Sequence, residues 1–219
     1  MQGPFPPVVR LRIHTRERRY RFEQAEALEA RLTPHVAAVA YDPGRIESDI
    51  LTVYLDTTPG TWSVGRARTK IRCKSYDGGA NWWFELKRRT GNVVDKWRRA
   101  AGIDELVRLM TGEDRWEAIR PFAGDRPMRA LFAVRYRRTA YEGGDLRVTV
   151  DRDVQIHAVQ PGQPWTVLDA VDRVPGVVVE AKRDGDLPPW LAPSLTGHEA
   201  KGFSKSRFAL ARVKTEGNS

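Results

Sequence analysis

Charged and apolar residues alternate along a stretch near the middle of the chain. From Ala67 to Arg89 the sequence reads ARTKIRCKSYDGGANWWFELKRR. Basic residues occupy every second position of its first half: Lys70, Arg72 and Lys74. Ile71 and Cys73 lie between them. Because successive side chains of a strand point to opposite faces, the pattern predicts a β-hairpin with one charged face and a turn at the Gly-Gly pair.

Similar patterns along the rest of the chain predict a sheet with a few helices. Further strands are expected at 14–22, 46–56, 92–99, 128–141, 145–159 and 175–185. Helical spacing and Pro positions predict helices at 23–36 and 204–213, a mostly helical segment at 102–122 that is broken at Gly112, and a short helix within 186–197, with a turn at 57–60. Residues 1–13, Pro-rich at their start, are expected to be a lead-in, and 213–219 a tail. Many long strands with inserted helices indicate an α+β chain built on an antiparallel sheet.

The composition is that of a folded protein with an anionic partner. Of 219 residues 41% are hydrophobic, and 37 Lys and Arg outnumber 28 Asp and Glu, giving a net charge of +9. Such an excess favours binding of nucleic acid, phosphate-rich metabolites or a membrane surface. The single cysteine excludes an internal disulfide and a multi-cysteine metal site. Without a signal segment or a long apolar run, we expect a cytoplasmic protein with no membrane span.

The charged face recurs on at least six predicted strands. Its members outside the first hairpin strand are Glu17, Arg19, Arg21, Glu85, Lys87, Lys96, Arg98, Arg147, Thr149, Asp151, Glu180 and Lys182. One interpretation is an outer face in contact with water. However, Arg88 places charge on the opposite face of its strand too, and carboxylates alternate with cations on a single face. The interior of a closed barrel with a polar cavity accounts for both observations.

Inward Arg and Lys side chains from several strands would surround a polyanion. Phosphate suits them, because a guanidinium forms bidentate contacts and an ammonium acts as a point charge. Inward carboxylates would neutralise part of this field, and one or two of them can hold a divalent cation. Mg²⁺ in particular binds one or two carboxylates together with substrate phosphates.

Nine short motifs follow one another in an order that is typical of one family. They are ERRY, VYLD, KIRCKSY, FELKRR, DKWRR, RYRRTAY, LRVTVD, VVVEAK and FSKSRF, spread over residues 14–212. This order resembles the VTC domain, the polyphosphate-polymerase domain of vacuolar transporter chaperone complexes and a member of the triphosphate tunnel metalloenzymes. The resemblance implies an α+β fold, an antiparallel eight-stranded β-barrel tunnel with flanking helices, over residues 14–212.

The resemblance also implies roles for particular residues. Arg19 stands where the first strand of the family has a Lys, and Glu180 matches the metal-binding Glu of a late Glu-x-Lys strand. The residues that match catalytic positions are Arg72, Lys74, Lys87 and Arg138, and those that match substrate-binding positions are Arg19, Lys96, Arg98, Arg147 and Lys205. Lys205 is expected on a C-terminal helix at one tunnel mouth. Whether Glu17 or Glu85 also contributes to the metal site stays open.

The implied activity is metal-dependent phosphoryl transfer, above all polyphosphate synthesis from ATP with Mn²⁺ or Mg²⁺. Attack by the terminal phosphate of a growing chain lengthens polyphosphate, whereas attack by water makes the same tunnel a triphosphatase. A non-catalytic sensor of polyphosphate or nucleotides is an alternative. For a nucleic-acid-binding protein the sequence offers no helix-turn-helix, zinc-finger or RNP motif. The expected partners are therefore ATP, triphosphate or polyphosphate, and the oligomeric state stays open.

Other conspicuous residues are expected to be structural. The four His residues lack metal-ligand spacing. Cys73 alternates with the basic residues and is expected to be buried. Trp82 and Trp83 precede the second hairpin strand. Because neighbours on a strand point to opposite sides, at most one of the two can face a ligand such as a nucleobase.

Overall fold

The structure, a computed structural model, divides into two compact units. It describes residues 9–13, 16–40, 45–56, 67–90, 93–111, 128–159 and 169–216. The first unit comprises Met1–His14, Leu51–Ala133 and Ala158–Asp169, and the second comprises Thr15–Ile50, Val134–His157 and Ala170–Ser219. The expected turn at 57–60 and the helical residues 112–122 lie outside the described residues.

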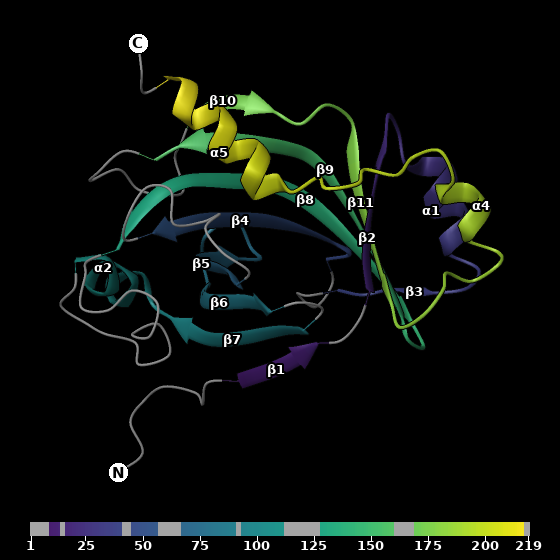
Figure 1. Ribbon diagram of the computed structural model, residues 1–219, viewed down its shortest axis with the longest axis horizontal. Coiled ribbons are helices and arrows are strands. Elements are labelled where there is room, and N and C mark those ends of the chain that lie inside the picture. Colours follow the sequence, from purple (N-terminus) through teal and green to yellow (C-terminus); the bar gives the residue numbers. More distant parts are fainter. Residues whose placement is uncertain are drawn as a thin grey trace. The chain divides into compact units, whose positions relative to one another are not determined.

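The strands of the first unit pair antiparallel in the order β1-β7-β6-β5-β4 (Figure 1). They are β1 (Val9–Ile13), β4 (Glu47–Asp56, from Leu51 on), β5 (Ala67–Ser75), β6 (Trp82–Thr90) and β7 (Val93–Ala101), and α2 (Ile103–Thr111) follows β7. Strand β1 departs from the expected lead-in, since it pairs with β7. The alternation over these five residues is too short to predict a strand from sequence alone, and pairing with β7 is what stabilises the extended conformation.

The predicted hairpin is formed by β5 and β6, and the residues between them hold its turn. Gly78 and Gly79 have φ angles of 75° and 119°, which residues with a Cβ rarely adopt. The Asp77 carboxylate accepts hydrogen bonds from the backbone N–H groups of Ala80 and Asn81, each at 3.0 Å. Such a side-chain acceptor fixes the loop locally. The turn therefore sets the register in which β5 faces β6.

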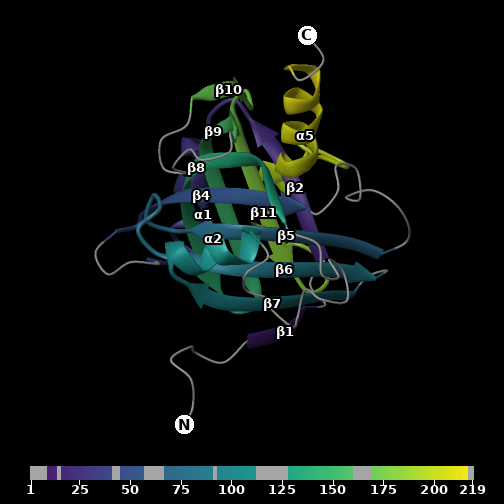
Figure 2. The ribbon, with the colours of Figure 1, turned by 90° about the vertical axis from the view of Figure 1, so that its left-hand side faces the viewer.

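One face of this sheet is apolar and forms the core of the first unit. Its buried members are Leu51, Val53, Leu55, Ile71, Cys73, Trp82, Phe84, Leu86, Ala101, Leu106, Met128 and Ala133. Leu106 comes from α2, which lies against the same sheet (Figure 2). Ile71 and Cys73 are both buried here, so the predicted apolar face of the hairpin is confirmed.

The second unit contains another antiparallel arrangement, in the order β8-β9-β11-β2, with β10 beside β9 and β3 beside β8. Its strands are β2 (Arg16–Phe22), β3 (Ala37–Ala38), β8 (Arg129–Gly143, from Val134 on), β9 (Leu146–Ala158), β10 (Ala170–Arg173) and β11 (Val177–Arg183). The helices are α1 (Glu26–Leu32), α4 (Ala192–Leu195) and α5 (Lys205–Glu216).

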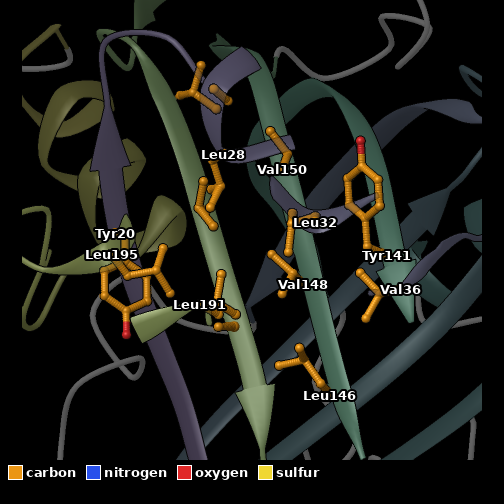
Figure 3. Packing of buried hydrophobic residues seen from close by; sticks show 14 residues of the cluster. Tyr20, Leu28, Leu32, Val36, Tyr141, Leu146, Val148, Val150, Leu191 and Leu195 are labelled. Carbon is orange, nitrogen blue, oxygen red and sulfur yellow. The ribbon is translucent and has the colours of Figure 1, made fainter. Parts of the chain in front are cut away.

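A second apolar cluster lies between these strands and the helices α1 and α4 (Figure 3). It combines Leu28 and Leu32 of α1 with Leu195 of α4 and with the apolar faces of β9 and β11. Gly176 allows β11 to approach β2 closely, because a Cβ there would lie 2.2 Å from the carbonyl oxygen of Phe22. Burial of this face explains why Leu146, Val148 and Val150 of β9 alternate with polar residues.

The expected α+β class and the long strands are confirmed. Eight of the described strands are at least seven residues long, and β1, β3 and β10 are short additions. The helices differ more: α1 is shorter than the predicted 23–36, α4 is the short helix expected within 186–197, and α5 extends beyond 204–213. Helix ends depend on capping and tertiary contacts that sequence spacing does not reveal. Among the described residues, no helix has the length and apolarity to cross a membrane.

Candidate functional site

The charged face of the first unit gathers side chains from three neighbouring strands. We call this set the β5–β7 cluster: Arg72, Lys74, Glu85, Lys87, Lys96 and Arg98. Arg72 lies opposite Glu85, which lies opposite Arg98, and Lys87 lies opposite Lys96. Because residues paired across a sheet share a face, the register brings together all five predicted site residues of these strands.

Glu85 is the centre of the β5–β7 cluster and is completely buried. The Arg72 guanidinium donates from Nε at 2.8 Å and from Nη2 at 2.6 Å to Glu85 Oε2. Lys96 Nζ lies 2.8 Å from Oε1, and Arg98 Nε lies 3.6 Å from the same oxygen. One carboxylate thus holds three cations of neighbouring strands side by side.

These cations keep the Glu85 carboxylate charged. Burial raises its pKa, but the positive charges of Arg72, Lys96 and Lys74 outweigh burial and hold the pKa well below its usual range. Burial lowers the pKa of Lys96, and the charge of Glu85 opposes that shift. The cluster therefore contains more positive than negative charge, which suits an anionic ligand.

Aromatic rings adjoin the β5–β7 cluster at the hairpin turn. The Arg98 guanidinium carbon lies 3.8 Å from the centre of the Trp83 ring and 5.1 Å from that of the Tyr76 ring. Lys74 Nζ lies 4.1 Å from the Tyr76 ring centre. Trp82 is buried in the apolar core and Trp83 is half-buried, as their opposite directions predicted.

The second unit carries its own charged set, the β2–β11 cluster: Glu17, Arg19, Tyr136, Arg138, Arg147, Asp151, Glu180, Lys182 and Lys205. Glu180 lies opposite Arg19 on β2 and opposite Thr149 on β9. Lys182 lies opposite Glu17 and Arg147 in the same two pairings. This register brings three of the predicted site residues together: Arg19, Arg147 and Glu180.

Asp151 is a second completely buried carboxylate. Arg138 donates from Nε at 2.5 Å and from Nη2 at 2.7 Å, and Lys205 forms an ion pair with the same group. Burial raises the pKa of Asp151, but Arg138 and Lys205 lower it by more, so the carboxylate stays ionised. The Arg138 guanidinium carbon lies 5.2 Å from the centre of the Tyr136 ring, and Lys205 Nζ lies 5.0 Å from it. Asp151 therefore links α5 to the sheet.

Glu180 has a carboxylate neighbour, Glu17, and the two share the same pair of cations. Glu180 contacts Lys182 Nζ at 2.6 Å and Arg19 Nε at 3.3 Å. Glu17 contacts the Arg19 guanidinium and lies 3.9 Å from Lys182 Nζ. Burial raises the pKa of Glu180, and Lys182 and Arg19 outweigh that effect, so its pKa lies well below the usual range. Glu180 is thus ionised, with Oε1 on Lys182 and Oε2 on Arg19.

The remaining contacts fix the edges of the β2–β11 cluster. Arg19 Nη1 donates at 2.6 Å to the carbonyl oxygen of Phe203, just before α5. Arg147 forms an ion pair with Glu142 at 2.6 Å. Within the described part of the chain, no three His, Cys, Asp or Glu side chains form a group that could enclose a metal ion.

Sequence reasoning missed the residues that organise the two clusters. Asp151 and Lys182 were placed on the charged face but were given no role, and Glu85 was considered only as a metal ligand. Their signal was present in the alternation, as the Asp of Arg-x-Thr-x-Asp and the Lys of Glu-x-Lys. Alternation does not reveal which residue of another element forms the ion pair. That information comes only from the strand register and the position of α5.

Comparison with solved structures defines the fold class. A Hippeastrum protein described as an adenylyl cyclase candidate with a dominant triphosphatase activity is 17% identical, with a TM-score of 0.53 over 89% of this chain and 94% of its own. A Bacillus halodurans protein, provisionally assigned as an adenylate cyclase, is 12% identical, with a TM-score of 0.56 over 90% and 97%. A Pyrococcus horikoshii protein is 10% identical, with a TM-score of 0.51 over 92% and 98%.

The fold is therefore that of the triphosphate tunnel metalloenzymes, as the resemblance implied. The model of the VTC domain family matches residues 15–214. The chain belongs to the VTC domain family. No curated protein matches the chain in sequence.

Proposed function

We propose that this VTC domain catalyses metal-dependent phosphoryl transfer on a triphosphate or polyphosphate. The observation that carries the proposal is the composition of the two clusters, in which Arg and Lys from neighbouring strands surround single ionised carboxylates. Membership in the family and the fold support the same substrate class. Each cluster is proposed to bind phosphoryl groups.

The cations contribute by position rather than by covalent chemistry. Phosphoryl transfer requires in-line geometry and neutralisation of charge on the non-bridging oxygens, and this leaves little covalent work for the protein. Arg72 and Arg138 are each held at Nε and Nη2 by a buried carboxylate. A guanidinium has five N–H donors, and each of these carboxylates accepts from two of them. Prior fixation by Glu85 and Asp151 lowers the entropy lost on binding.

A divalent cation fits the β2–β11 cluster as a partner of the substrate. Glu180 and Glu17 are the residues that would hold it, because both are carboxylates on one face and share the same neighbours. Two carboxylates and substrate phosphates are the ligand set that Mg²⁺ typically accepts, and Mn²⁺ also suits oxygen ligands. When bound, the ion supplies charge neutralisation at the phosphoryl group. In the absence of substrate, the positive charges of Arg19 and Lys182 balance the negative charges of the two carboxylates.

The nucleophile decides the product. Attack by the terminal phosphate of a polyphosphate chain on the γ-phosphorus of ATP forms a new P–O–P bond, breaks the bond to the β-phosphate oxygen and releases ADP. We propose this polymerase reaction, as the family suggests. Attack by water at the same atom releases inorganic phosphate, and the triphosphatase activity described for the Hippeastrum protein favours this second candidate.

Replacement of Glu180 by Gln separates catalysis from binding. Gln keeps the shape and removes the negative charge, so Glu180→Gln is expected to abolish metal-dependent turnover of ATP and tripolyphosphate while tripolyphosphate binding persists. Glu26→Gln, at an exposed position of α1, is the matched control. Full turnover by Glu180→Gln would contradict the proposed role. A wild-type protein that binds tripolyphosphate but never turns it over with Mn²⁺ or Mg²⁺ would instead be a sensor.

A further inference from the structure

We propose that Trp83 and Tyr76 bind the nucleoside end of a nucleoside triphosphate, next to the phosphate-binding cations of the β5–β7 cluster. The inference rests on the proposed function and names its substrate class. A chain of phosphates contains no ring, and aromatic side chains offer it nothing that Arg and Lys do not provide better. A nucleoside triphosphate joins a flat base to a polyanion. It matches a surface where aromatic rings adjoin cations.

Strand register places Trp83 on the charged face. Trp83 lies opposite Lys74 on β5 and two residues before Glu85 on β6. Side chains two apart on a strand point to the same side, so the Trp83 ring lies on the side of Glu85. Tyr76 directly follows β5 at the turn, and Lys74 and Arg98 both lie against its ring.

The two rings differ from core aromatics in their environment. Trp82, on the opposite face of the same strand, is buried among apolar side chains. Trp83 and Tyr76 are only half-buried, and the cations of Lys74 and Arg98 lie against their rings. A purely structural Trp is more favourably placed on the apolar face, where its full area leaves water. On the charged face its ring is positioned to stack with a ligand.

Arg98 connects the two parts of this site. Its guanidinium carbon lies 3.8 Å from the Trp83 ring centre, and its Nε lies 3.6 Å from Glu85. The same side chain therefore touches the aromatic rings and the cluster proposed to bind phosphate. A ligand with its base on the rings and its phosphates on Lys96 and Arg72 would use contacts that lie along neighbouring strands. Such stacking is tolerant of the identity of the base.

The test compares two substrates that share the phosphates and differ in the nucleoside. For the 219-residue protein, kcat/KM is measured with ATP and with inorganic tripolyphosphate, and the value for ATP divided by the value for tripolyphosphate is the readout. Because stacking of a base on an aromatic ring typically contributes about 1–3 kcal/mol, the ratio is expected to fall about 5- to 160-fold in Trp83→Ala. Trp83→Phe keeps a ring and should retain most of the ratio. Tyr76→Ala should lower it in the same direction.

Trp190→Ala is the control, because Trp190 is also half-buried but stacks on His35 in the other unit. Its ratio should equal that of the wild type. A ratio that stays within about twofold of wild type in both Trp83→Ala and Tyr76→Ala would overturn the inference and leave the proposed function intact, since both substrates would then depend on the rings equally. A wild-type protein that turns over neither substrate would overturn both. The ratio is insensitive to a general loss of active protein, so partial unfolding does not imitate the effect.

Discussion

Removal of the Glu85 carboxylate should destabilise the protein strongly. The side chain of Glu85 is 0% exposed, and the side chains of its partners Arg72, Lys96 and Arg98 are 21%, 17% and 27% exposed. Deleting one partner of a buried ion pair costs about 3–5 kcal/mol, because the remaining charges lose their compensation. The three cations retain some access to water. We therefore expect Glu85→Ala to lower the free energy of unfolding by about 3 kcal/mol.

The assay is urea unfolding at pH 7, with a thermal scan as a second measure. A loss of 3 kcal/mol corresponds to a decrease in Tm of roughly 6–12 °C for a chain of this size. The matched control is Glu47→Ala, whose side chain pairs with Arg137 at the surface, where the two are 38% and 53% exposed. Exposed pairs contribute about 0–1 kcal/mol. A Glu85→Ala variant that loses no more than Glu47→Ala would refute the reasoning.

The pH dependence supplies an independent check on the same residue. The folded-state pKa of Glu85 is depressed below its ordinary value of 4.5, so its contribution to stability is present above that pH. The contribution is lost as pH falls below 4.5 toward the depressed folded-state pKa. The stability difference between wild type and Glu85→Ala should consequently be constant near neutrality and shrink in acid. A difference that grows in acid would have the wrong sign.

Two further predictions concern other buried groups. Asp151→Asn should lower the free energy of unfolding by about 3–5 kcal/mol, because Lys205 and Arg138 lose their ionised partner. It should also accelerate amide hydrogen exchange in the first turn of α5, which begins at Lys205. Unchanged exchange in α5 would contradict this. The Cys73 thiol is completely buried. Its pKa is raised mainly by burial and additionally by the nearby negative charge of Glu85. Native protein at pH 8 should therefore react with a disulfide reagent only at the rate of unfolding, and rapid stoichiometric labelling would show the thiol to be accessible.

Alternation along single strands was enough to predict much of the fold and the membership of the charged faces. Cys73 and Trp82 lie in the apolar core and Arg72 and Trp83 on the other face, as period-two spacing requires. Spacing says nothing about which strand lies beside which, so the Arg72–Glu85 and Arg19–Glu180 pairs appear only with the register. The Lys205–Asp151 pair joins segments 54 residues apart by number, and no local pattern encodes it.

The short elements were the least predictable for a related reason. Strand β1 is stabilised by its pairing with β7, and β3 is only two residues long. Neither has enough alternating residues to define a period. Helix α4 consists of Ala192–Leu195 alone, whereas the pattern places a short helix within 186–197 without fixing its ends. In each case tertiary contacts, rather than local propensity, decide where the element begins and ends.

Product analysis tests the central claim most directly. Purified protein is incubated with ATP and Mn²⁺, and long-chain polyphosphate, ADP and inorganic phosphate are measured, with Glu180→Gln run in parallel. The account predicts metal-dependent cleavage of the γ-phosphoryl group in the wild type, with ADP and polyphosphate as products and no turnover in Glu180→Gln. Phosphate in place of polyphosphate would select the triphosphatase reaction. Intact ATP in the wild type, with either Mn²⁺ or Mg²⁺, would contradict phosphoryl transfer by this domain.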